Sequence, residues 1–151
     1  MKKFFITILL LAGIVLKSEA QDYSTISKEY CLCFEKLKDT MKAEYRELII
    51  KATSEVDIKT AFVREAGKLS DEKRKELSIQ LSKIGVMMDS DDNEAGKCGI
   101  KLDEIYAEYN DTPEKEKVFG DKMIVALKDF PDCAFFNAIL KLALAFSEEG
   151  E

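Results

Sequence analysis

The chain of 151 residues has no histidine and no tryptophan, and it has few prolines and glycines. Histidine is the commonest general base and metal ligand in proteins, so its absence excludes Ser-His-Asp and Cys-His catalysis and the usual His-bearing zinc sites. Catalysis would have to use carboxylate, Lys, Tyr, Ser or Cys side chains, and no spacing in the sequence singles out such a set. We therefore expect a protein that is not an enzyme, with no metal and no cofactor.

The chain also lacks a dense basic patch. It carries 23 Lys and Arg residues against 29 Asp and Glu residues, a formal net charge of −6. An acidic surface repels phosphate backbones and anionic lipid headgroups. The composition therefore predicts that the protein has no nucleic-acid partner.

The beginning of the chain has the pattern of an export signal. Lys2 and Lys3 precede an apolar run over residues 4–16, and small side chains stand at −3 and −1 relative to Gln21. The apolar run is shorter than the ~20 residues that span a bilayer. We expect residues 1–20 to be a cleaved signal peptide, so that the mature protein is periplasmic or secreted and is not stably inserted in the membrane.

Cleavage after Ala20 would leave residues 21–151 as the mature chain. It would carry 20 basic and 28 acidic side chains, a net charge of −8. A chain of this length forms one domain and buries roughly two thirds of the surface that its unfolded form exposes. We therefore expect a single helical domain over residues 21–151.

Helical periodicity is the main structural signal in the mature chain. Apolar residues recur every three or four positions, and no segment alternates apolar and polar residues as a half-buried strand would. One stripe extends from Ile26 to Ala52 and predicts a continuous helix from about Thr25 to Ala52. The sequence predicts an all-α bundle of five or six helices stapled by two disulfides.

Helix starts are marked by residues that cap exposed backbone N–H groups. Ser54 and Ser70 would cap the second and third helices, and Thr112 followed by Pro113 would start the fifth. The fourth helix is expected over about Glu94–Tyr109. The last would open at Pro131-Asp132 and run to about Ser147.

Four cysteines remain in the mature chain: Cys31, Cys33, Cys98 and Cys133. An even number in an exported chain indicates two disulfides. At 100° per residue, Cys31 and Cys33 lie on nearly opposite sides of the buried stripe of their helix, so they cannot bond each other. Each is expected to pair with Cys98 or Cys133, which leaves two connectivities open. Either would close loops of roughly 65 to 100 residues, contributing on the order of 4 kcal/mol each.

The Cys31-Leu32-Cys33 segment also has a redox interpretation. Lys28 and Lys36 lie nearby and would lower the pKa of a thiol, which favours a thiol-disulfide redox protein. The βαβ pattern of thioredoxin-like enzymes is missing. The redox hypothesis is therefore kept as a second alternative.

The final helix is apolar around most of its circumference. Such a helix lies at the centre of a bundle or uses its second face elsewhere. For the second case, the candidate interaction surface consists of Phe135, Leu142 and Phe146. Two functions follow from this helix. In the first, the protein binds an unknown protein partner, or associates with itself, at the cell envelope. In the second, it is the carrier of an apolar small molecule or lipid held between helices beneath the Cys-x-Cys helix.

Three motifs carry a resemblance to other sequences. They are Cys31-Leu32-Cys33 in the first mature helix, Cys98 at the head of a later helix, and Phe130-Pro131-Asp132-Cys133-Ala134-Phe135-Phe136 near the end. Together they resemble a loose group of uncharacterised exported four-cysteine helical proteins from Bacteroidetes-type bacteria. The resemblance covers the cysteine frame and about the mature length. It implies an exported helical domain and transfers no functional residue.

Overall fold

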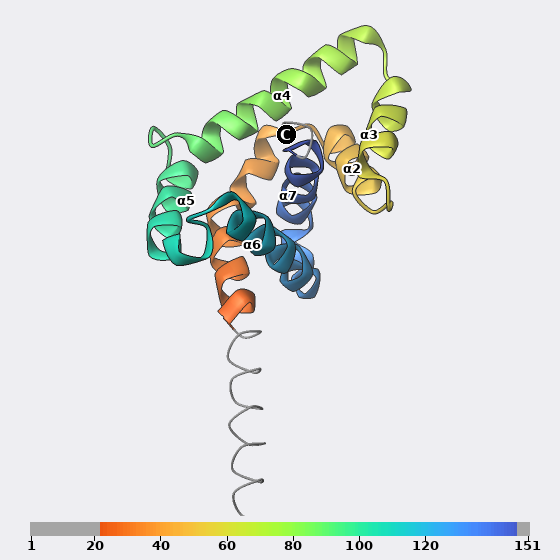
Figure 1. Cartoon of the computed structure of the whole chain (residues 1–151). Coiled ribbons are helices and arrows are strands. Elements are labelled where there is room, and N and C mark those ends of the chain that lie inside the picture. Colours follow the sequence, from red (N-terminus) through yellow and green to blue (C-terminus); the bar gives the residue numbers. More distant parts are fainter. Residues whose placement is uncertain (1–21, 148–151) are drawn as a thin grey trace, which may run out of the picture.

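The computed structural model describes residues 22–147 (Figure 1). The predicted signal peptide lies outside this range, so the prediction of cleavage and export stays a prediction. All regular secondary structure within residues 22–147 is helical. The all-α prediction is confirmed.

Seven α-helices make up the described part of the chain, so the prediction of five or six is wrong. The first covers residues 22–34, and we call it the N-terminal helix. The others are α2 (Ala43–Ala52), α3 (Ile58–Gly67), α4 (Asp71–Asp89), α5 (Glu94–Ile105), α6 (Pro113–Ala126) and α7 (Ala134–Ser147). Short 3-10 helices lie between them: η1 (Glu35–Thr40), η2 (Ala107–Tyr109), η3 (Leu127–Asp129) and η4 (Pro131–Cys133).

The extra helix arises because the predicted helix from Thr25 to Ala52 is divided. The backbone becomes extended at Met41 (φ −115°, ψ 137°), and Lys42 has ψ 144°. The N–H of Lys42 then donates a hydrogen bond to Oε1 of Gln80 on α4, at 2.9 Å. A contact with a distant segment therefore satisfies the backbone group that the break releases.

Helix caps follow the sequence with one exception. The Ser70 side chain accepts a hydrogen bond from the Lys73 N–H at the start of α4, and Thr112 caps α6 with Pro113 in its first turn. The prediction that Ser54 caps the second helix is wrong. Asp57 caps α3 by accepting from the Thr60 N–H, and the Ser54 hydroxyl donates to the Lys51 carbonyl at the end of α2.

Helix α7 lies at the centre of the fold, in contact with α2, α3 and α6. Phe135 and Leu142 are each only 8% exposed, because helices cover α7 on several sides. The prediction that they form an outward interaction surface is therefore wrong. Phe146 is 43% exposed, and its ring packs edge-on against Phe62 of α3. The apolar circumference of α7 is explained by central packing.

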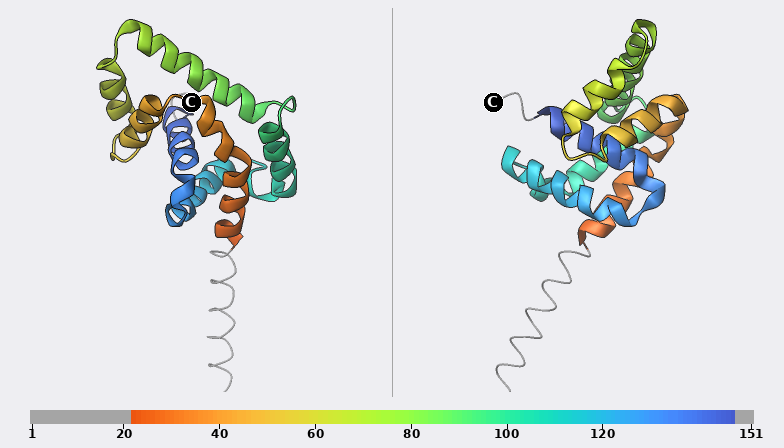
Figure 2. Two further views of the ribbon diagram at one scale, coloured as in Figure 1. Left: turned by 180° about the vertical axis from the view of Figure 1, so that it is seen from behind. Right: turned by 90° about the vertical axis from the view of Figure 1, so that its right-hand side faces the viewer.

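Helix α4, in contrast to α7, lies at the periphery of the fold. In Figure 1 and in both views of Figure 2 it spans the outer edge of the molecule, with α3 at one end and α5 at the other. Only Leu77 and Ile84 among its 19 residues are buried. A long helix that buries so little of its surface leaves most of one face accessible.

Gly96 allows the close approach of α4 and α5. A Cβ at this position would lie 1.8 Å from the carbonyl oxygen of Ser90 and 2.7 Å from that of Met87. These are backbone atoms, so an added methyl group would force the connection between the two helices to move. Asn93 fixes the same connection, because its side chain accepts from the Gly96 N–H and donates to the Met87 carbonyl.

We expect Gly96→Ala to lower the free energy of unfolding by about 3 kcal/mol, the upper end of the range for overpacking. Gly85→Ala in α4 is the matched control, because its Cβ would meet no atom within 4 Å. It should stabilise by up to about 1 kcal/mol through helix propensity. Urea unfolding followed by circular dichroism compares the two variants. Equal effects on stability would show that the α4–α5 approach does not depend on Gly96.

Candidate binding groove

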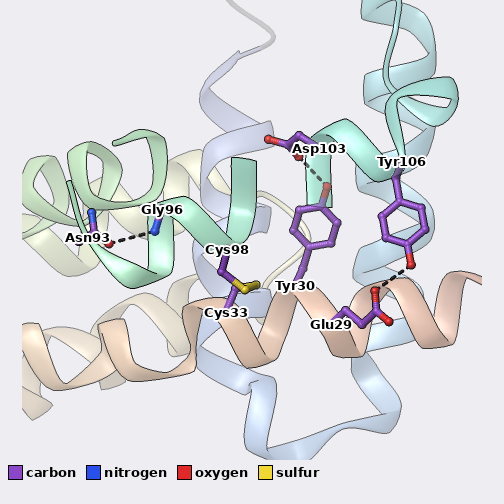
Figure 3. The surroundings of a disulfide bond; sticks show 8 residues. All are labelled: Glu29, Tyr30, Cys33, Asn93, Gly96, Cys98, Asp103 and Tyr106. Carbon is purple, nitrogen blue, oxygen red and sulfur yellow. Dashed lines mark hydrogen bonds between the residues drawn. A yellow bond between two sulfur atoms is a disulfide. The ribbon is translucent and has the colours of Figure 1, made fainter. Parts of the chain in front are cut away.

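Two disulfides join the N-terminal helix to distant segments. Cys31 bonds Cys133 in η4, across 102 residues. Cys33 bonds Cys98 in α5, across 65 residues, as Figure 3 shows. The helical phase left two connectivities open, and the structure contains the one that pairs Cys31 with Cys133 and Cys33 with Cys98. The N-terminal helix is therefore tied to the start of α7 on one side and to α5 on the other.

The disulfides do not have the exposure of a redox site. Cys31, Cys33 and Cys133 are 2%, 8% and 5% exposed, and Cys98 is half-buried. Cys31 and Cys33 are each bonded to a different part of the chain. Thiol-disulfide exchange requires a sulfur that an external thiolate can reach. The arrangement favours structural crosslinks over the redox alternative.

Tyrosine hydroxyls reinforce the contact between the N-terminal helix and α5 (Figure 3). Tyr30 donates a hydrogen bond to Oδ1 of Asp103 at 2.6 Å, and Tyr106 donates to Oε2 of Glu29 at 2.7 Å. Burial, with the hydrogen bond to Asp103, raises the pKa of Tyr30, and the bond to Glu29 raises the pKa of Tyr106. Both phenols therefore stay protonated at neutral pH and serve as donors that hold the two helices together.

Aromatic rings fill the space beneath the Cys-x-Cys helix. The ring of Tyr30 packs against Phe34, Tyr106 and Phe119, and Phe34 also packs against Phe136, with centroid separations from 5.3 to 6.4 Å. These are ordinary separations for packed aromatic pairs. A ligand in this position would have to displace core side chains, so the geometry favours no apolar ligand there.

A groove of about 470 Å³ lies between α3 and α4 and is open to solvent. Its lining combines apolar side chains from both helices with three polar ones on α4: Phe62, Ala66, Leu77 and Leu81, then Arg74, Ser78 and Ser82. The Arg74 guanidinium donates to the carbonyls of Gly67 and Leu69 and pairs with Asp71. Since Arg74 is held by these bonds, the groove offers an apolar floor with a polar edge.

A second cleft, of about 670 Å³, lies between the loop after α2 and helices α6 and α7. Its lining includes acidic Glu55, Asp57 and Asp121 beside basic Lys59 and Lys141. Lys141 donates to the carbonyl of Thr53 at 3.3 Å, which ties the loop to α7. The mixture of charges favours no particular ligand, so the apolar groove is the stronger candidate.

The ion-paired carboxylate of Glu65 holds α3 to α2. Glu65 is 8% exposed, and its carboxylate accepts from Lys68 at 2.7 Å and from Lys51 at 3.1 Å. These hydrogen bonds lower the pKa of Glu65 from 4.5 to about 2. Because the folded pKa is below the unfolded value, the stabilisation is present above pH 4.5 and is lost as the pH falls toward 2.

We expect Glu65→Gln to destabilise the protein at pH 7 and to have a much smaller effect near pH 2. The reason is that the wild-type carboxyl then becomes protonated and loses its charge-assisted bonds. Thermal unfolding at several pH values measures this difference. Glu72→Gln, at an exposed position of α4, is the control. A destabilisation by Glu65→Gln that does not change with pH would contradict the ion-pair account.

Within residues 22–147, no helix has the length and apolarity needed to cross a membrane, and no three His, Cys, Asp or Glu side chains are grouped so as to hold a metal ion. No protein-family model, curated protein or solved structure matches the chain. The proposal for its function therefore depends on the geometry of the chain itself.

The groove was not predicted from the sequence. Leu77 and Leu81 lie four residues apart and share a face of α4, but only Leu77 is buried. The signal that could have revealed it is a second set of apolar residues on the same helix. Ile79 and Val86 lie off that face and seven residues apart, so they share another one. The structure leaves them 59% and 64% exposed.

Proposed function

We propose that this is an exported helical binding protein that acts through protein–protein contact at the cell envelope. The contact surface is formed by α3 and α4, residues 58–89, which we call the arm. The observation that carries the proposal is the open groove between these two helices, with its apolar floor of Phe62, Ala66, Leu77 and Leu81. An apolar helix face of a partner can bind in a groove of this kind through side chains at helical spacing.

Exposed apolar side chains extend the surface of the arm beyond the groove. Val63 on α3 is 64% exposed, and Ile79 and Val86 on α4 have similar exposure. These exposed apolar side chains lie on the same two helices as the groove and add apolar area that a bound partner would cover. A protein partner covers such an extended surface more completely than a small molecule does.

The proposed location has support from the cysteines. Four of four cysteines in the chain are bonded, in two crosslinks that tie distant segments. Disulfides of this kind persist in oxidising compartments and are rare in the cytosol. Together with the predicted signal peptide, they favour a protein that works outside the cytosol.

Site-specific photo-crosslinking in the native envelope tests the proposal. A photoreactive amino acid at Ser82, on the edge of the groove, should yield discrete crosslinked products. The same amino acid at Asp129 in η3, also exposed and outside the arm, should not. Filling the groove with Ser78→Trp should remove the products at Ser82. Equal products from both positions would contradict the proposal.

The groove also supports a second candidate, the carrier of an apolar small molecule or lipid. Its volume of about 470 Å³ and its apolar floor match sites for small ligands, which span about 300–1,000 Å³. Native mass spectrometry of protein purified from an exporting host tests this function. A bound amphiphile in the wild type that Ser78→Trp removes would favour the carrier, and wild-type protein with no bound mass would exclude it.

A further inference from the structure

The two disulfides are nested in the sequence. Cys31, the first cysteine of the chain, bonds Cys133, the last, and the bond between Cys33 and Cys98 lies inside this loop. During export from the N-terminus, Cys31 and Cys33 enter the oxidising compartment together, Cys98 follows, and Cys133 comes last. When Cys98 arrives it meets two free thiols, and only the thiol of Cys33 gives the native bond.

Loop closure does not distinguish these two thiols. The bond from Cys98 to Cys33 spans 65 residues, and a bond from Cys98 to Cys31 would span 67. The entropic cost of closing a loop grows only with the logarithm of its length, so the two bonds should form at rates within about 5% of each other. Oxidation of the unfolded chain should therefore give the native pairing and a crossed pairing, Cys31–Cys98 with Cys33–Cys133, in comparable amounts.

The chain that is oxidised has little structure to guide the pairing. Both disulfides close long loops, and together they supply a stabilisation comparable with that of a whole small domain. The reduced chain should therefore be largely unfolded. Its oxidation converts four thiols to two disulfides and reduces two equivalents of a disulfide oxidant to dithiols.

The folded structure, in contrast, separates the two thiols. Cys31 and Cys33 lie about 160° apart around the N-terminal helix, and both are buried, Cys31 against η4 and Cys33 against α5. Tyr30 and Phe34 lie on the face between them and are each 6% exposed, whereas Leu32 lies opposite and is 63% exposed. Exchanging the partners would require the helix to turn by about 160°, which buries Leu32 and moves Tyr30 and Phe34 out of the core. The crossed isomer therefore cannot form the native core.

We infer that the exported chain is a substrate of thiol-disulfide isomerisation, and that an isomerase presenting a reactive thiolate converts the crossed isomer to the native one. The inference rests on the proposed export of the chain, and it gives the protein a partner during maturation besides the partner of the arm. Without the native core, the crossed isomer leaves its disulfides accessible to a thiolate. The native isomer buries three of its four cysteines, so exchange slows once the native pairing is reached.

Three exchange steps convert the crossed isomer without net oxidation or reduction. The catalyst thiolate attacks Sγ of Cys98, forming a mixed disulfide, and Cys31 leaves as a thiolate. Cys31 then attacks Sγ of Cys133, which forms the first native bond and releases Cys33 as a thiolate. Cys33 attacks Sγ of Cys98, which forms the second native bond and returns the catalyst thiolate.

Refolding of the purified chain tests the inference in vitro. The reduced, denatured chain is oxidised with diamide in the absence of thiols, and the bonds are mapped after proteolysis between Cys31 and Cys33. The bonds Cys33–Cys98 and Cys31–Cys98 should form within about twofold of each other. A buffer of reduced and oxidised glutathione should then raise the native bond to an excess of about tenfold. Native pairing alone without any thiol, or a crossed isomer that glutathione does not convert, would overturn the inference.

Export in a host that lacks thiol-disulfide isomerase activity tests the partner. The wild-type chain should carry about tenfold more crossed isomer there than in the parent host. The variant Cys31→Ser/Cys133→Ser is the matched control, because it retains only Cys33 and Cys98 and should form its one bond equally in both hosts.

Equal isomer ratios of the wild-type chain in the two hosts would exclude the isomerase as partner. A chain that keeps its leader and four reduced thiols in both hosts would contradict the proposed export instead. The refolding experiment does not depend on export, so it still decides whether the native pairing requires exchange.

Discussion

Replacing Cys31 and Cys133 together by alanine should lower the free energy of unfolding by about 5 kcal/mol. The Cys31–Cys133 bond closes a loop of 102 residues, and in the chain-entropy model a loop of this length contributes about 4.7 kcal/mol. Both cysteines are buried, at 2% and 5% exposure, so their removal also loosens the packing between the N-terminal helix and α7. A domain of this size has only about 5–15 kcal/mol of stability in total.

The Cys33/Cys98 pair provides the comparison. Its loop of 65 residues contributes about 4.3 kcal/mol in the same model, so its removal should cost slightly less. Urea unfolding of each double-alanine variant, monitored by circular dichroism, measures both values. Loss of both bonds should leave the chain largely unfolded. A loss below about 1 kcal/mol for Cys31/Cys133 would show that this bond is not a structural crosslink.

Phe34→Ala should cost about 3–5 kcal/mol, the range for truncating a buried phenylalanine. The side chain is 6% exposed, and its ring lies 5.3 Å from that of Phe136, centroid to centroid. It also packs directly on the backbone of Gly99, since a Cβ there would lie 2.5 Å from Cζ of Phe34. The cavity would open where the N-terminal helix, α5 and α7 meet, so no single helix could close it.

Leu32→Ala is the control for this variant. Leu32 lies two residues away on the same helix and is 63% exposed, so its truncation should change stability by less than about 0.5 kcal/mol. Both variants can be compared by urea unfolding of the oxidised protein. If they had similar effects, the aromatic cluster beneath the Cys-x-Cys helix would not be the packed core that we describe.

Local signals predicted most helix boundaries, since caps act within a few residues. Ser70, Thr112 and Pro113 behave as their residue types predict. The break at Met41 was not predicted, because the apolar spacing continues through it. The Lys42 N–H at the break donates a hydrogen bond to Gln80, in a segment 38 residues away. Such a contact leaves no trace in the local periodicity.

The disulfide pairing was likewise predictable only in part, where it depends on local geometry. Helical phase alone excluded a Cys31–Cys33 bond, because it depends only on local geometry. The choice between Cys98 and Cys133 depends on which side of the N-terminal helix α5 and α7 occupy, and this is decided by packing. Cys33 faces α5, where the Tyr30–Asp103 and Tyr106–Glu29 bonds hold the two helices together.

Amphipathic patterns also failed to separate central from peripheral helices. The pattern of α7 allowed Phe135 and Leu142 an outward position, yet both are buried because neighbours surround the helix. Apolar residues also recur at helical spacing in α4, yet Leu81 lines an open groove. A pattern shows which residues avoid water. How completely other helices cover them depends on the tertiary arrangement.

The arm is the proposed surface through which the protein contacts its partner. The most direct test is the crosslinking yield at Ser82 relative to that at Asp129, measured in the native envelope with the full-length chain. Discrete products are expected at Ser82, Ser78→Trp should abolish them, and Asp129 should give none. A yield at Ser82 no higher than at Asp129 would show that the arm is not the contact surface.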